Sequence, residues 1–207
     1  MQADLYLNYL LVAFLTITSP GAAILLAINN AMQYNLRAVL FSTLGNILGL
    51  LLLATVAMLG VGILLKSSPV FFQILKWIGG AYLVYLGLGQ IRRDPPRLKV
   101  DSSQSHSHFD PWPIFRKGFL VAATNPKPIL FFSAIFPLFM DPKRNALPQF
   151  AIMTGTFLAI SFASLMFYGY LSSRAKAWFL DEKKLKWFYR ISGSAFVVMG
   201  IGLAFWG

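Results

Sequence analysis

The strongest constraint on this chain is a series of apolar runs, each about as long as a bilayer is thick. A membrane-spanning helix needs about 20 mostly apolar residues. The sequence contains six such runs, at residues 5–30, 38–65, 70–91, 118–140, 147–172 and 188–206. The runs are too long for strands and lack an alternation of apolar and polar residues. The sequence therefore predicts an all-α integral membrane protein with six transmembrane helices.

The composition supports a membrane protein over a soluble one. Hydrophobic residues make up 57% of the chain and charged residues only 12%, about half the charged fraction of a typical soluble domain. Disordered chains are poor in apolar residues, so disorder is excluded as well. The chain has no cysteine, which excludes disulfides, thiolate metal sites and cysteine nucleophiles.

The basic residues are distributed unevenly between the predicted loops. The chain carries 18 Lys and Arg against 7 Asp and Glu. About thirteen of the basic residues follow the first, third and fifth runs and about four lie on the opposite side, and cytoplasmic loops carry the excess of Lys and Arg. Both termini are therefore expected on the outer side of the membrane. This asymmetry accounts for the net charge of +11, so no nucleic-acid partner is needed.

The only long polar stretch covers residues 92–116 and is rich in Pro, Ser and charge. It is typical of a cytoplasmic linker, and it would join two halves at 1–91 and 117–207. His106 and His108 lie in this stretch, but two histidines are an incomplete ligand set for a metal ion. We expect a solvated loop there and no metal site.

The two halves share an internal repeat. Residues 18–21 read Thr-Ser-Pro-Gly and 124–127 read Thr-Asn-Pro-Lys; 78–81 and 191–194 read Ile-Gly-Gly-Ala and Ile-Ser-Gly-Ser; 87–89 and 200–202 read Gly-Leu-Gly and Gly-Ile-Gly. Three helices per half is an odd number, so the second half would run inverted through the membrane. In transporters of this plan the binding site lies at the repeat interface. The glycines are assigned to close helix packing, within the chain or between the chains of a homo-oligomer.

Proline interrupts the first and fourth runs. Ser19, Pro20 and Gly21 lie inside the first run, and Asn125, Pro126 and Lys127 inside the fourth. Proline removes a backbone donor and clashes with the preceding turn, so each run should split into two half-helices. Ser or Asn followed by Pro is also a helix-start signature. Each second half-helix would then expose N–H groups and a positive dipole end near the membrane centre, which favours an anionic group such as a carboxylate.

Lys127 is the charged residue that lies deepest in any run. Such a charge is costly unless it is paired or lines a wet cavity, and the acidic residues all lie in loops or at run ends. Alternatively, Lys127 extends to the membrane surface or bonds a neighbouring carbonyl. Asn46 would bind a substrate ammonium or hydroxyl, or bond a neighbouring helix. The predicted substrate-binding residues are Ser19, Pro20, Gly21, Asn46, Asn125, Pro126 and Lys127.

The two proline motifs, and a glycine-rich third run that ends Tyr-Leu-Val-Tyr-Leu-Gly at 82–87, resemble the LysE/RhtB superfamily of bacterial inner-membrane exporters. The nearest resemblance is to its homoserine, threonine and leucine efflux branch, and it covers essentially the whole chain. It implies export of amino acids or their relatives, coupled to the proton gradient. Family members often have a polar or acidic residue after Ser-Pro-Gly-Pro, whereas this chain has Ala22 and Ala23. A carboxylate proton relay and a dicationic substrate are therefore disfavoured.

We expect an exporter of a small neutral or zwitterionic amino acid or derivative, with no cofactor and no enzymatic activity. Lys127 and the half-helix N–H groups would hold the substrate carboxylate. Transport would proceed by rocking one three-helix repeat against the other. A metal-cation exporter is the alternative, but it needs acidic, His or Cys ligands inside the runs. An intramembrane enzyme needs a base beside its nucleophile, and serines such as Ser161 have none in the runs.

Overall fold

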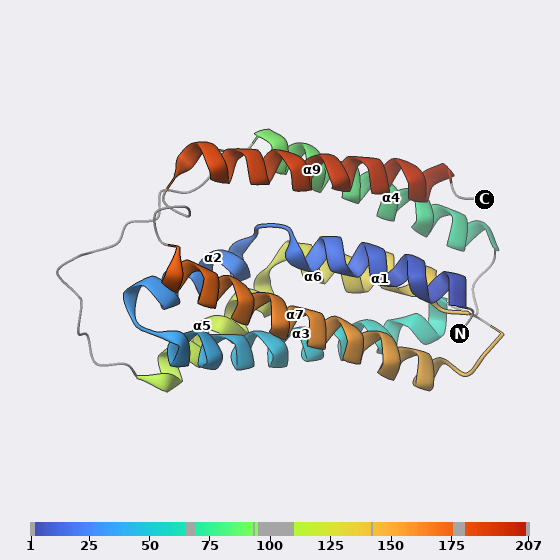
Figure 1. Cartoon of the computed structure of the whole chain (residues 1–207). Helices are drawn as coiled ribbons and strands as arrows, with labels where there is room; N and C mark the ends of the chain where they lie inside the picture. The colour runs from blue at the N-terminus through green and yellow to red at the C-terminus, as the bar shows by residue number, and fades with distance from the viewer. Residues whose placement is uncertain are drawn as a thin grey trace.

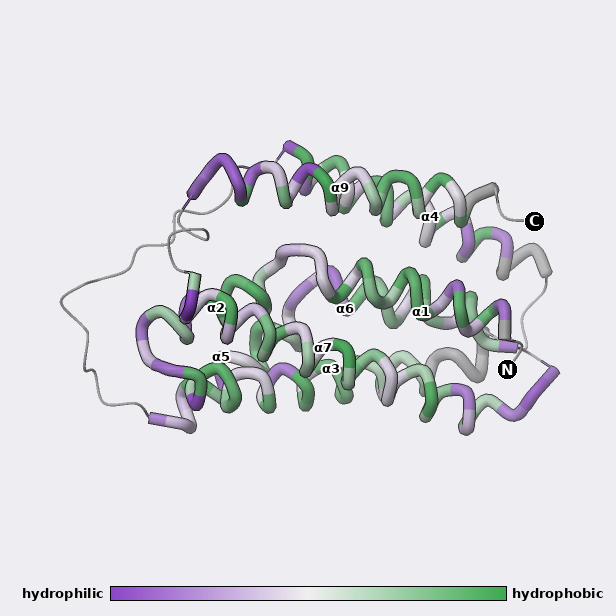
Figure 2. The backbone as a smooth tube through the Cα atoms, viewed as in Figure 1, coloured by the Kyte–Doolittle hydropathy of each residue, from purple (hydrophilic) through white to green (hydrophobic). Residues whose placement is uncertain are grey.

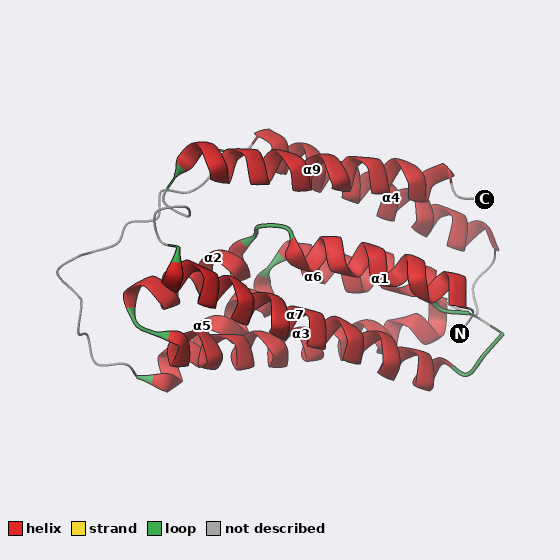
Figure 3. Cartoon of the chain, in the orientation of Figure 1, coloured by secondary structure: helices red, strands yellow, loops and turns green. Residues whose placement is uncertain are grey.

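The structure is a computed structural model, and it describes residues 3–64, 69–92, 94, 110–141, 143–175 and 181–205. These residues form helices and their connections, with no strand among them (Figure 3). The helices lie along one another in an elongated bundle. The beginning of the first helix and the end of the last lie at the same end of this bundle (Figure 1).

The predicted runs correspond closely to the helices. In chain order these are α1 (Ala3–Thr18), α2 (Ala22–Gln33), α3 (Leu36–Leu64), α4 (Pro69–Arg92), α5 (Pro111–Thr124), α6 (Pro126–Leu130), the π-helical turn η2 (Phe131–Ile135), the 3₁₀ turn η3 (Phe136–Phe139), α7 (Ala146–Arg174) and α9 (Glu182–Phe205). Apolar residues concentrate along the middle of the bundle, and many hydrophilic ones lie toward its two ends (Figure 2). This distribution is that of a protein that crosses a membrane.

Two helices are long and apolar enough to cross a membrane on their own, α7 and the segment Leu36–Leu59 of α3. Two bent pairs also qualify if each pair counts as one span, which gives up to four candidate spans among the described residues. The helices α4 and α9 are not among these candidates. The arrangement of six spans as inverted repeats therefore stays a prediction.

Both predicted breaks are present. The axes of α1 and α2 meet at 47° around Ser19–Gly21, and the axis of α5 meets the following segment, Pro126–Phe139, at 46°. In that segment the regular helix gives way to η2 and η3. The irregular turns are held inside the protein, where Phe131, Phe136 and Phe139 pack around Tyr9. Irregular backbone at membrane depth is tolerated only in such buried or water-lined positions.

The fourth run begins earlier than expected, at Pro111 and not at residue 118. The Asp110 side chain accepts a hydrogen bond from the Trp112 N–H at 3.1 Å, and Pro111 takes the first helical position. This cap starts a helix in polar sequence, which a reading for apolar runs does not detect. The predicted linker 92–116 is therefore wrong at its end, because 111–116 belong to α5. His106 and His108 lie outside the described residues.

The predicted glycine faces are used within the chain, where α4 packs against α9. A Cβ atom added to Gly87 would lie 2.5 Å from the carbonyl oxygen of Gly193, and one added to Gly200 would lie 2.6 Å from that of Gly80. Only glycine permits helices to approach so closely. Elsewhere α3 packs against α5, and α7 packs against both α1 and α2. Helices of the first predicted repeat thus pair with helices of the second.

Candidate substrate-binding site

The first break is built differently from the prediction. Ser19 does not cap α2; it closes the end of α1, because its N–H donates to the Leu15 carbonyl at 3.1 Å and its hydroxyl donates to the Thr16 carbonyl at 3.1 Å. Gly21 occupies the cap position of α2, in an extended conformation and with no side-chain hydrogen bond. The first N–H groups of α2 therefore have no side-chain cap, as an anion-binding helix end requires.

The second break follows the prediction. Asn125 caps α6, with its side-chain oxygen accepting from the Lys127 N–H at 3.0 Å, and Pro126 takes the first helical position. This bond occupies one of the N–H groups that the sequence offered for a substrate. The backbone N–H groups that remain free at the two breaks are thus mainly those in the first turn of α2.

The ammonium of Lys127 reaches from the second break to the first. Its Nζ donates to the Ser19 carbonyl at 3.1 Å and also to the Ser19 hydroxyl. It lies 5.4 Å from the centre of the Phe196 ring in α9, within cation–π range. The bond to the Ser19 carbonyl agrees with a structural role for this lysine. A role in substrate binding is compatible with that bond, because Lys127 also lines a cavity.

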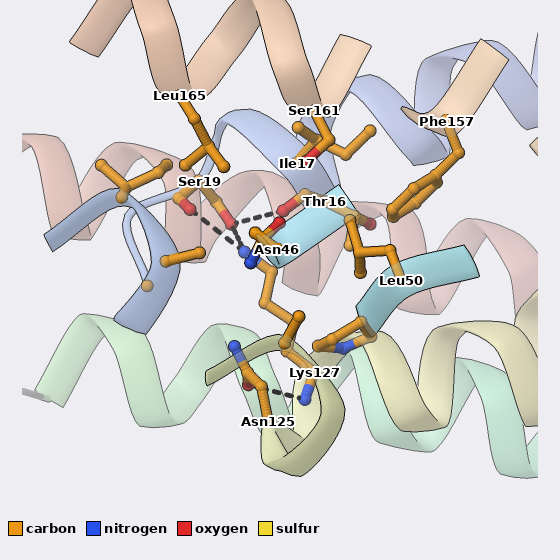
Figure 4. A pocket seen from close by; sticks show the side chains of 15 residues that line it. Thr16, Ile17, Ser19, Asn46, Leu50, Asn125, Lys127, Phe157, Ser161 and Leu165 are labelled. Carbon is orange, nitrogen blue, oxygen red and sulfur yellow. Dashed lines mark hydrogen bonds between the residues drawn. The ribbon is translucent and has the colours of Figure 1, made fainter. Parts of the chain in front are cut away.

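This cavity lies between the two breaks and measures about 60 Å³, which is enough space to hold water molecules. Its described lining includes five of the seven residues predicted for the site, namely Ser19, Gly21, Asn46, Asn125 and Lys127. Figure 4 labels all of these except Gly21. Pro20 and Pro126 are not in the lining; they shape the breaks. Lys127 carries the only charge among the described lining residues.

Other residues of the cavity wall are not among those predicted from the sequence. Thr16 contributes from α1, and Ser161 contributes from α7 between Phe157 and Leu165. Their spacing is the available signal: Thr16 is one helical turn before Ser19, and the three α7 residues are four positions apart, so each set shares one helix face. Nothing in the sequence alone indicates that these two faces meet.

Two tyrosines from other helices donate hydrogen bonds to backbone carbonyl groups at the breaks. The Tyr168 hydroxyl of α7 donates to the Thr18 carbonyl at 3.0 Å, and the Tyr82 hydroxyl of α4 donates to the Pro126 carbonyl at 3.1 Å. Unpaired backbone groups inside a membrane cost several kcal/mol each. These contacts therefore stabilise the breaks from outside the broken helices.

Comparison with known proteins identifies the family. The model of the family described as LysE type translocator matches residues 14–207 of this chain. The chain belongs to this translocator family. A homoserine/homoserine lactone efflux protein of Salmonella typhimurium is 30% identical to the translocator over 99% of its length and 98% of the relative. An uncharacterised membrane protein of Vibrio cholerae is 31% identical over the same shares. No solved structure matches the translocator.

The family places the translocator in a bacterial membrane, with a small molecule as its substrate. The family is described as translocators, and two of the relatives, from Salmonella typhimurium and Salmonella typhi, are named efflux proteins. Among the described residues, no three His, Cys, Asp or Glu side chains come together as a metal site would require. The cavity at the two breaks is therefore the candidate substrate site.

Proposed function

We propose that this chain exports a small neutral or zwitterionic amino acid, or a close derivative, across the bacterial inner membrane. The observation that carries the proposal is the Lys127 ammonium, which lines a cavity between two broken helices with no carboxylate in its described lining. A charge at this depth is by default a functional group. Export would be coupled to the proton gradient, as the family resemblance implies.

The cavity offers partners for both charged groups of an amino acid. The substrate carboxylate would accept hydrogen bonds from Lys127 and from the uncapped N–H groups of α2. Asn46 is 4% exposed and has no hydrogen-bond partner among the described residues. Its side-chain oxygen is available for the substrate ammonium.

The cavity also favours one substrate class. A second positive charge on the substrate would face Lys127 with no lining carboxylate to balance it, which disfavours lysine-like and arginine-like molecules. Homoserine, which appears in the names of the Salmonella relatives, is a small zwitterion of the favoured class. We therefore propose homoserine as the first substrate to test.

The proposed architecture is six spans in two inverted repeats, with both termini outside. The helix pair α4–α9 supports it through reciprocal contacts: Gly80 meets Gly200, and Gly87 meets Gly193. In the internal repeat Gly80 corresponds to Gly193 and Gly87 to Gly200. Such exchange of partners is what a two-fold axis between the halves produces.

This pairing argues against rocking one repeat as a unit, because that motion would separate glycine backbones packed across the repeats. We propose instead that α4 and α9 move together against the other helices. The pair contacts the site through Tyr82 on the Pro126 carbonyl and Phe196 beside the Lys127 ammonium. Its motion would therefore change access to the cavity.

Export can be measured as uptake of labelled homoserine into inside-out membrane vesicles energised with a proton gradient. We expect uptake that a protonophore abolishes. Lys127→Met should lower it about ten- to a hundredfold, because a hydrogen bond to a charged group is lost. Lys117→Met is the matched control, since Lys117 is an exposed lysine on the preceding helix α5. Unchanged uptake in Lys127→Met would remove this lysine from the mechanism.

The orientation can be tested separately, because the chain has no cysteine of its own. Single cysteines introduced as Asp4→Cys and Asp110→Cys should react with a membrane-impermeant thiol reagent from opposite sides. We expect labelling of the first from outside the cell and of the second only in inside-out vesicles. Labelling of both from one side would contradict the proposed topology.

A further inference from the structure

Two hydroxyl groups in the cavity wall have no hydrogen-bond partner among the described residues. Thr16 in α1 is 3% exposed, and its hydroxyl is buried and unpaired. Ser161 in α7 is 5% exposed and makes no hydrogen bond with a described residue. Both residues line the cavity (Figure 4). A buried hydroxyl without a partner costs about 1–3 kcal/mol, so the unpaired Thr16 hydroxyl requires an explanation.

Several other hydroxyls in the bundle donate to the backbone of their own helix, although Thr154 and Ser164 of α7 are buried and unpaired outside the cavity. Thr18, Thr55, Thr124 and Thr156 each donate to the carbonyl four residues earlier, at 2.7–2.8 Å. Ser172 and Ser173, on the same helix as Ser161, donate to the carbonyls three residues earlier. The backbone thus offers an acceptor to Thr16 and Ser161 too, and neither side chain uses it.

The position of the Thr16 hydroxyl relative to Lys127 is set by α1. The Lys127 ammonium is bonded to Ser19, and Thr16 lies one turn earlier, about 4.5 Å along the helix axis. That separation is comparable to the length of a short amino-acid side chain. A substrate whose carboxylate lies at Lys127 would therefore direct its side chain toward Thr16.

We propose that Thr16 and Ser161 form a side-chain subsite that selects substrates with a hydroxyl group on a short side chain. The inference rests on the proposed function, because the carboxylate at Lys127 orients the substrate. Hydroxyl groups both donate and accept, so the two side chains match a substrate hydroxyl and leave a methyl group in its place unpaired. The flanking side chains of Phe157 and Leu165 are apolar and suit the methylene groups.

Competition between homoserine and norvaline tests the subsite, since norvaline has a methyl group where homoserine has its hydroxyl. The measured quantity is the ratio of their initial rates of uptake into inside-out vesicles. We expect Thr16→Val and Ser161→Ala each to lower the homoserine-to-norvaline ratio about tenfold, the value of one hydrogen bond. Norvaline uptake should be retained.

The matched controls are Thr18→Val and Ser173→Ala, which remove backbone-bonded hydroxyls from the same two helices. Both should leave the ratio unchanged. An unchanged ratio in Thr16→Val and Ser161→Ala would overturn the subsite. It would indicate that the two hydroxyls bond to water and not to the substrate. A parallel loss of both uptakes would also overturn it, in favour of a structural role. Wild-type vesicles that take up neither amino acid would overturn the proposed function itself, and the subsite with it.

Discussion

The ammonium of Lys127, at the start of α6, donates hydrogen bonds to the carbonyl and the hydroxyl of Ser19, at the end of α1. One side chain thus joins the two broken helices across the cavity that lies between them. The carbonyl at a helix end carries partial negative charge, so Ser19 compensates part of the lysine charge while the site is empty. A substrate carboxylate would compete with Ser19 for the same ammonium, which couples substrate binding to the contact between the breaks.

A double-mutant cycle measures this contact. Ser19→Ala removes the hydroxyl acceptor, and we expect it to lower the free energy of unfolding by about 1–2 kcal/mol, because a hydrogen bond to a charged group is lost. In the Lys127→Met background the same change should cost much less, since the ammonium is gone. Thermal unfolding of the purified variants in detergent is the measurement. Equal costs in the two backgrounds would contradict the hydrogen bond.

Removing the cap of α6 tests whether this cap contributes to transport as well as to stability. Asn125→Ala should cost about 1 kcal/mol, as loss of a helix cap does, and should also impair homoserine uptake because it releases the backbone of Lys127. Asn145→Ala is the control, since Asn145 caps α7 through the Leu147 N–H at 3.2 Å and does not line the cavity. We expect similar unfolding midpoints and different uptake rates. Equal uptake in the two variants would show that the cap has no part in binding.

The helix pair α4–α9 is expected to tolerate no side chain at its closest point. Gly87→Leu places atoms where the Gly193 carbonyl and the Val197 backbone N–H already lie, and we expect at least 1–3 kcal/mol of destabilisation from overpacking. Gly89→Leu should be neutral or stabilising, because nothing lies within 4 Å of its Cβ position and leucine favours helix more than glycine does. Cross-linking between α4 and α9 and the thermal unfolding midpoint would be measured for both variants. A stable Gly87→Leu variant would argue against the packed pair.

A pH-dependent contact lies outside the apolar part of this pair. Lys186 donates to Asp94 at 2.7 Å, and this hydrogen bond, with the charge of the ammonium, holds the pKa of the Asp94 carboxyl below its usual value. The stabilisation is present above the unfolded-state pKa and is lost as the pH falls through the lower folded-state pKa.

Because Asp94 is exposed and Lys186 is only half-buried, we expect Asp94→Asn to change the unfolding midpoint at neutral pH only slightly. Lys186→Ala should raise the pKa of Asp94, as measured by carbon NMR of labelled aspartate. Lys183→Ala is the control, since Lys183 is an exposed lysine near the start of the same helix whose backbone N–H, and not its side chain, bonds to Asp181. An Asp94 pKa that is the same in wild type and Lys186→Ala would contradict the contact.

Features that depend on neighbouring residues were predictable from the sequence. Proline removes a donor and clashes with its own preceding turn, so Pro20 and Pro126 break their helices wherever those helices pack. The Asn125 cap follows from the same local geometry. The start of α5 at Pro111 was predictable in principle, from Asp110 followed by proline, but not from hydropathy.

Features that depend on contacts between distant segments needed the fold. Serine can cap a following helix or bond the helix behind it, and the sequence cannot tell which; in the structure Ser19 does the second and turns its oxygens toward Lys127. Thr16 and Ser161 resemble any other membrane-helix hydroxyls until packing places both in the wall of one cavity. The helix breaks and the position of Lys127 within its run follow from residues that are neighbours in the sequence. The binding site exists only because packing brings α1, α3, α6 and α7 around the same cavity.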